Sequence, residues 1–166
     1  MNKDLKVTFE IPPELDTNKP YVWIATWGGA GFLGPAPGTW GSFAGLLCGI
    51  PILWISGITG LLFATILVIT LGLWAAYAFD KVLEEHDSKM IVIDEIAGVW
   101  IAMLPAALNP LLLLLSFLLF RAFDIYKPGP IGVFDRDIRG AAGVMGDDLL
   151  AGLAAALCVW GISLVL

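Results

Sequence analysis

The stretch LLFATILVITLGLW, residues 61–74, decides the fold class of this chain. It contains no charged residue, and it lies within a neutral block that covers residues 20–79. Two further neutral blocks cover residues 96–120 and 149–166. A helix needs about 20 predominantly apolar residues to cross a bilayer. The sequence therefore predicts an all-α fold, a polytopic bundle of membrane-embedded helices.

The composition of the 166 residues points to the same class. Hydrophobic residues make up 58% of the chain and charged residues 14%, whereas soluble domains carry about 25% charged residues. Disorder is excluded by the high hydrophobicity, and a small soluble domain could not cover so much apolar surface. The formal net charge of −6 argues against nucleic acid as a partner, because such a partner requires a basic face.

We expect five membrane-embedded helices, at 40–57, 58–79, 90–108, 110–126 and 142–166. The turns at Ser56-Gly57 and Asn109-Pro110 carry no charge, whereas all nine Lys and Arg residues lie in the segments at the other end. By the positive-inside rule, this charged end faces the cytoplasm.

The segment 21–39 is apolar but rich in Gly and Pro, which disfavour a regular helix. We expect it to be interfacial or re-entrant, with its tryptophans at headgroup level. This divides the chain into a polar N-terminal extension with the start of the interfacial segment, 1–30, and a membrane-embedded domain, 31–166. The charged residues of 81–89, His86 among them, and of 135–139 are expected to lie in solvated loops, although an arginine of 135–139 could also contact a lipid headgroup.

Carboxylates from three of the expected helices fall at the same depth, at the cytoplasmic helix ends. They are Asp94, Glu95, Asp124, Asp147 and Asp148. Carboxylates buried together cannot all stay ionised without compensating charge. Arg121, Asp124 and Lys127 share one helix face by their spacing, so two cations can offset part of this charge. A hard divalent cation such as Mg²⁺, which takes oxygen ligands, would offset more.

These groups predict an oxygen-ligand metal site that accepts an anionic substrate, most simply a phosphate. The segment PGTWGS, residues 37–42, opens the first expected helix, where Thr39 or Ser42 can cap it and where free N–H groups favour anions. A plainer alternative stays open at this stage: the paired acids could serve only as acids near helix N-termini, and Arg121 could simply extend towards the interface.

Four motifs then carry a family resemblance. They are APGTWGS at 36–42, IVIDEIAGVW at 91–100, LFRAFDIYKPGPI at 119–131 and GAAGVMGDDLLAG at 140–152. By these motifs, in this order and spacing, the chain resembles the bacterial phosphatidylglycerophosphatase A family from about residue 31 onward. It departs from the family pattern at three places but keeps every acidic position. Gly129 stands where an aromatic residue is common, Ala141-Ala142 where Gly-Gly or Gly-Leu is usual, and Gly146 where bulkier residues are common.

The resemblance implies a Mg²⁺-dependent lipid phosphatase of the bacterial cytoplasmic (inner) membrane, with its active site facing the cytoplasm. Its substrate would be the anionic phospholipid phosphatidylglycerophosphate, and its products phosphatidylglycerol and inorganic phosphate. The catalytic residues carried over from the family are Asp94, Glu95, Asp124, Lys127, Asp147 and Asp148. We expect the metal ligands among Asp94, Glu95, Asp147 and Asp148. The expected substrate-binding residues are Thr39, Arg121 and Lys127, and the base that accepts a proton from water is Asp124 or Glu95.

Two other functions are weighed against this one. A CDP-alcohol-type lipid headgroup transferase also uses carboxylates and Mg²⁺, but the sequence lacks its usual Asp-Gly-x-x-Ala-Arg signature. A small carboxylate-lined transporter would need a polar route through both halves of the membrane, whereas all charges here fall at one end. Gly41, Gly45 and Gly49 permit close helix packing within or between chains, so an oligomer is possible.

Overall fold

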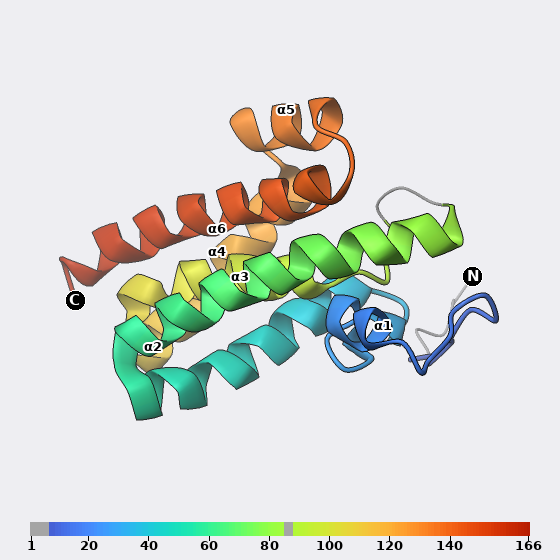
Figure 1. Ribbon diagram of the computed structural model, residues 1–166. Coiled ribbons are helices and arrows are strands. Elements are labelled where there is room, and N and C mark those ends of the chain that lie inside the picture. Colours follow the sequence, from blue (N-terminus) through green and yellow to red (C-terminus); the bar gives the residue numbers. More distant parts are fainter. Residues whose placement is uncertain (1–6, 85–87) are drawn as a thin grey trace, which may run out of the picture.

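The computed structural model describes residues 7–84 and 88–166, and within these ranges the chain forms six α-helices and two short 3-10 helices (Figure 1). In chain order they are α1 (Pro20–Ala25), η1 (Ala30–Phe32), α2 (Pro37–Leu83), α3 (Ile93–Met103), η2 (Leu104–Ala106), α4 (Pro110–Tyr126), α5 (Pro130–Asp137) and α6 (Ala141–Ser163). The predicted all-α class is confirmed. Predictions that concern residues 1–6 and Glu85, His86 and Asp87 lie outside the described residues.

Helix α2 is a hairpin of two helical arms. Gly57 lies in its middle with φ +64°, a left-handed conformation that glycine adopts without steric cost. The helix is broken at this residue, and Figure 1 shows the chain reversing direction within α2. The two arms correspond to the helices predicted at 40–57 and 58–79, and the turn falls where the sequence predicts it.

The first arm of α2 lies directly on α3 through a stripe of small residues, Gly41, Gly45 and Gly49. A Cβ added at any of the three would overlap side chains of residues 92–103. The Trp100 indole Nε1–H also donates to the carbonyl oxygen of Gly45 at 2.7 Å. This glycine stripe therefore serves packing within the chain.

Two helices, α2 and α6, are long and apolar enough to cross a membrane. The prediction of five membrane-embedded helices is therefore wrong in number. Helix α3 has only 11 residues, because residues 88–92 form a turn before it and Pro105 lies in the 3-10 helix that follows it. Helix α4 has 17 residues, short of the roughly 20 that a span needs.

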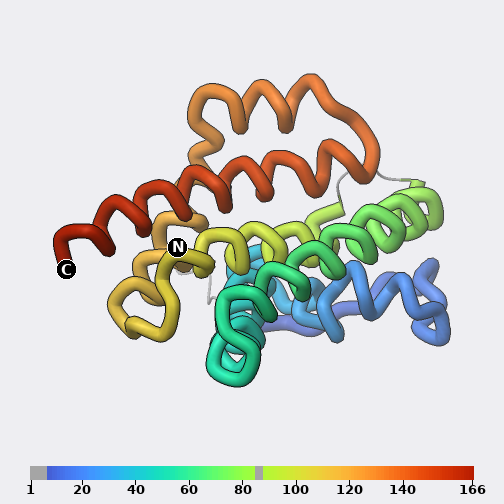
Figure 2. The backbone as a smooth tube through the Cα atoms, turned by 60° about the vertical axis from the view of Figure 1, so that its left-hand side comes forward, coloured from blue at the N-terminus to red at the C-terminus, as the bar shows by residue number. Residues whose placement is uncertain are grey.

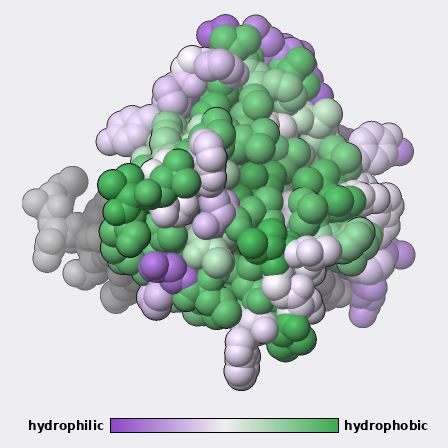
Figure 3. Space-filling model, turned by 90° about the vertical axis from the view of Figure 1, so that its left-hand side faces the viewer, coloured by the Kyte–Doolittle hydropathy of each residue, from purple (hydrophilic) through white to green (hydrophobic). Residues whose placement is uncertain are grey.

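The outer surface of the bundle is apolar over much of α2 and α6. Large side chains that are more than half exposed include Trp54, Ile55, Phe63, Leu67, Leu157 and Trp160. Figure 3 shows the end of the bundle that holds the α2 reversal and the C-terminal end of α6, and hydrophobic residues cover most of it. Exposed apolar surface of this extent is typical of a surface that meets lipid or another protein.

The segment 21–39 contains more regular structure than its Gly and Pro content predicts. Helix α1 begins with Pro20 at its first position, where proline is tolerated, and η1 follows. The rings of Trp27 and Trp100 pack edge to face at 5.7 Å, and the Val92 N–H donates to the Ala25 carbonyl at 2.9 Å. These contacts fix the segment against α3, whereas its place at the membrane interface and the domain boundary at residue 30 stay predictions.

Helices α3 and α6 approach most closely at two glycines, and Figure 2 shows the two helices side by side. A Cβ on Gly152 would overlap the backbone of Gly98, and a Cβ on Gly98 would overlap the Phe120 ring and the carbonyl oxygen of Asp148. Because no side chain separates the two backbones, α6 brings its acidic residues up to the beginning of α3.

A bulky residue at this crossing should force α3 and α6 apart. We expect Gly152→Val to lower the free energy of unfolding by about 2 kcal/mol, since overpacking a tight contact costs this much. Gly161→Val is the matched control on the same helix, because a Cβ there meets open space. Unfolding of detergent-solubilised protein measures both, and equal losses in the two variants would contradict the close crossing.

Candidate functional site

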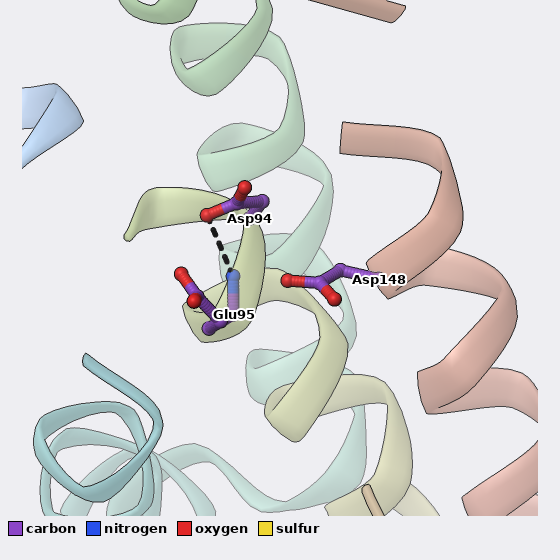
Figure 4. A group of neighbouring side chains, drawn as sticks. All are labelled: Asp94, Glu95 and Asp148. Carbon is purple, nitrogen blue, oxygen red and sulfur yellow. Dashed lines mark hydrogen bonds between the residues drawn. The ribbon is translucent and has the colours of Figure 1, made fainter. Parts of the chain in front are cut away.

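Three carboxylates meet where α6 passes the first turn of α3. Asp94 and Glu95 project from α3 and Asp148 from α6, and each offers one oxygen within 4.8 Å of the others (Figure 4). The side chains point towards one another, and the Glu95 N–H donates to Asp94 Oδ1 at 3.0 Å. Asp94 and Asp148 are buried, with 7% and 4% of their surface exposed. This acidic cluster, Asp94, Glu95 and Asp148, could hold a metal ion.

Arg121 links the acidic cluster to two other helices. Its Nη1 pairs with Asp124 one turn later on α4 and lies 3.9 Å from Glu95 Oε1. The same nitrogen donates to Ser42 Oγ at 3.3 Å, and Nη2 donates to Thr39 Oγ1 at 3.4 Å. The predicted shared face of Arg121 and Asp124 is therefore present, and the start of α2 joins the site.

The beginning of α2 contributes to the site differently from the prediction. The helix begins at Pro37 with Ala36 as its N-cap and no side-chain cap, so the predicted capping by Thr39 or Ser42 is wrong. Ser42 donates instead to the carbonyl oxygen of Gly38 at 2.7 Å. A side chain at Gly38 would overlap the Glu95 carboxylate, which shows how closely this helix start approaches the cluster.

Lys127 does not stay on the predicted face with Arg121. It follows α4 as the C-cap with φ 42°, and its ammonium donates to Asp147 Oδ2 and Asp135 Oδ1, each at 2.5 Å. Burial lowers the pKa of Lys127, but the hydrogen bonds and charges of the two aspartates outweigh it, so its pKa lies above the ordinary value. Of the four predicted metal ligands, three form the acidic cluster, whereas Asp147 binds Lys127.

Asp135 is a neighbour of the site that the sequence analysis missed. The sequence predicts a solvated loop over 135–139, but residues Pro130–Asp137 form helix α5. The available signal was Pro130 at the first helical position followed by Ile131, Phe134 and Ile138 at helical spacing. The loop prediction is therefore wrong for Asp135, Arg136 and Asp137, which all lie in α5, although all three side chains are exposed.

The site carries more negative than positive charge, with six carboxylates, Asp135 included, around two cations. Among the described residues, no group donates a hydrogen bond to the buried oxygens Glu95 Oε2 and Asp147 Oδ1, and Arg121 Nε is also buried without an acceptor. Buried polar atoms of this kind are costly unless a partner meets them. Carboxylate oxygens are the ligands that hard divalent cations prefer, so the residues present fit such an ion.

Comparison with known proteins decides the family. The family model described as phosphatidylglycerophosphatase A matches residues 23–163. The chain belongs to the phosphatidylglycerophosphatase A family. Its relatives include the phosphatidylglycerophosphatase A of Haemophilus influenzae, which is 39% identical over 146 residues, covering 86% of this chain and 88% of the relative. The phosphatidylglycerophosphatase A of Escherichia coli K12 is 32% identical over 146 residues, covering 86% of this chain and 83% of the relative.

A third relative carries a different name. A Bacteroides thetaiotaomicron protein, provisionally named a phosphatidylinositol-3-phosphatase, is 37% identical over 140 residues, covering 80% of this chain and 86% of the relative. No solved structure matches the chain. As a phosphatidylglycerophosphatase A homologue the chain is a phosphatase, and its family implies a lipid substrate. Membership therefore confirms the resemblance and favours the phosphatase over the transferase and the transporter.

Removing the charge of Arg121 should lower the stability of the protein, because nearby carboxylates lose their positive partner. We expect Arg121→Met, without added divalent cation, to lower the free energy of unfolding by about 3 kcal/mol, because it leaves Asp124 and Glu95 uncompensated. Arg136→Met removes only the exposed partner of Asp137 and should change stability by less than about 0.5 kcal/mol. Unfolding in detergent measures both, and an unchanged stability in Arg121→Met would contradict the partly buried ion pairs.

Proposed function

We propose that the chain is a Mg²⁺-dependent phosphatase that hydrolyses the terminal phosphate monoester of phosphatidylglycerophosphate to phosphatidylglycerol and inorganic phosphate. The observation that carries this proposal is the buried acidic cluster with Arg121 beside it. The cluster supplies oxygen ligands for Mg²⁺, and the arginine supplies positive charge for a phosphate. The family and the two relatives named phosphatidylglycerophosphatase A support the choice of lipid.

In this proposal Asp94, Glu95 and Asp148 hold the metal. Glu95 Oε2 is buried without a donor among the described residues, which favours a cation as its partner. When bound, Mg²⁺ acts as a Lewis acid that withdraws charge from the phosphoryl oxygens. Asp147 serves the site through its ion pair with Lys127 and lies next to Asp148 in the chain.

The remaining residues bind the phosphate and move the proton. Arg121 and Lys127 neutralise the charge that develops on the phosphoryl oxygens as water attacks phosphorus. Asp124, which lies outside the acidic cluster and beside Arg121, accepts a proton from that water. The bond from phosphorus to the glycerol oxygen breaks, and the proton passes to this leaving oxygen, so that the two products are the alcohol of phosphatidylglycerol and inorganic phosphate.

An apolar groove supports a lipid substrate at this site. It is lined by Thr39, Trp40, Phe43 and Phe117, and the rings of the two phenylalanines pack at 6.3 Å. Thr39 is also the residue whose hydroxyl accepts from Arg121. The groove therefore begins at the cationic side of the site, an arrangement that suits a molecule with an anionic phosphate and an apolar tail.

The site lies at one end of the bundle, which suits a surface of the membrane. It is built from the start of α2, α3 and α6 and from the end of α4, whereas the reversal within α2 lies at the other end (Figure 1). With α2 and α6 in the bacterial cytoplasmic membrane, the positive-inside rule places the site at the cytoplasmic face.

Phosphate release from detergent-dispersed phosphatidylglycerophosphate tests the proposal. EDTA should abolish release and added Mg²⁺ should restore it. Asp94→Asn and Asp148→Asn should each slow turnover by about 100-fold or more, since they weaken electrostatic stabilisation of the transition state. Glu84→Gln, an exposed acid beyond the end of α2, is the control and should retain full turnover.

Binding of Mg²⁺ can be followed without substrate. Saturating Mg²⁺ at about 100 times its Kd should stabilise the wild-type protein by about 2.7 kcal/mol, and this gain should vanish in Asp94→Asn and Asp148→Asn. Normal turnover in both variants, or release that is indifferent to EDTA, would refute the metal site. Phosphatidylinositol 3-phosphate, assayed in parallel because of the Bacteroides relative, would replace the proposed substrate if it were hydrolysed faster.

A further inference from the structure

Helix α5 packs against the outside of α6, close to the site (Figures 1 and 2). Ile131 is buried in this contact region, and the Phe134 ring stands over Gly146, where any Cβ would overlap it. Gly146 directly precedes Asp147. The ring therefore fixes α5 against the same turn of α6 that presents Asp147 to Lys127.

Asp135 follows Phe134 in sequence, and this docking brings its carboxylate to Lys127. The ammonium of Lys127 is held at 2.5 Å from Asp135 Oδ1 on α5 and at 2.5 Å from Asp147 Oδ2 on α6. The two partners differ in exposure, since the Asp147 side chain is 8% exposed and that of Asp135 38%. Asp135 is thus the outer of two anchors for one cation.

Two anchors restrict a side chain that would otherwise be mobile. Lysine carries a compact, strongly hydrated charge on a flexible four-carbon stem, and one partner leaves many orientations of the stem open. With a carboxylate on each of two helices, the ammonium is held in one place, and the third of its three N–H donors stays available for a phosphate oxygen.

We propose that Asp135 is a positioning residue that holds Lys127 for the substrate phosphate, an inference that rests on the proposed role of Lys127 in the phosphatase reaction. Asp135 itself does not touch the phosphate. Asp135 orients Lys127 in the transition state. Because Asp135 is an anion, it does not strengthen binding of the anionic substrate. Loss of Asp135 therefore lowers kcat and leaves KM nearly unchanged.

Kinetics of three variants test this role. Asp135→Asn should lower kcat about 10-fold, the size expected for a hydrogen bond to a charged group, with KM within about twofold of the wild-type value. Asp135→Glu keeps the carboxylate and should recover most of the loss. Asp137→Asn, two residues later on the same helix and paired only with exposed Arg136 among the described residues, should match the wild type.

A double-mutant cycle separates positioning from a structural effect. If Asp135 acts through Lys127, Asp135→Asn should cause no further loss of kcat in a Lys127→Met background. In both backgrounds, wild type and Lys127→Met, adding Asp135→Asn should leave the unfolding temperature unchanged. A loss of the same size in that background would overturn the proposal, as would wild-type kcat in Asp135→Asn.

Chemical labelling tests the same contact without substrate. An amine-reactive acylating reagent, with mass-spectrometric readout, should modify Lys127 faster in Asp135→Asn than in the wild type, with exposed Lys19 as the internal reference. Equal labelling rates would refute the anchor. Absence of phosphate release by the wild type would refute the proposed function instead, and labelling would still decide whether Asp135 holds Lys127.

Discussion

Burial of several carboxylates at one point of an apolar bundle is the constraint on which the rest of this structure depends. Burying any one of these charged groups without a partner would cost free energy. The helices that carry them therefore pack together only if positive charge lies beside the carboxylates. Arg121 supplies part of it from within α4, and Lys127 supplies part from the residue that ends this helix. Glu95 Oε2, which has no donor among the described residues, belongs to the acidic cluster, where a bound cation would satisfy it, so the same groups serve folding and phosphate chemistry.

Small residues make the convergence possible. Gly98 and Gly152 let the backbones of α3 and α6 touch, and Gly38 lets the start of α2 approach Glu95. A larger side chain at any of these points would stand between the helices and separate groups that now lie within 4.8 Å. The geometry of the site is therefore set by the packing of helices against one another. A site built on helices is more rigid than a site built on loops.

Helix α5 extends the site beyond the acidic cluster. Its apolar face packs on α6 through Ile131 and Phe134, and its polar face delivers Asp135 to Lys127. A short amphipathic helix thus couples the end of α4 to the start of α6. The ion pairs around Lys127 connect three elements that lie next to one another in the chain, which explains how a residue outside the bundle core can influence its polar centre.

The sequence by itself determined the all-α class, the reversal at Gly57, the break at Asn109-Pro110 and the charged residues that meet at the site, apart from Asp135. It did so because an apolar chain can place charge only where helices end or where partners neutralise it, and because Gly and Pro act locally on the backbone. Only the tertiary structure decided the partners of the charged groups: Lys127 binds Asp147 on α6 and Asp135 on α5, and Arg121 lies beside Glu95 on α3. These pairings depend on where each helix docks against the others, and the spacing of residues along one helix does not contain that information.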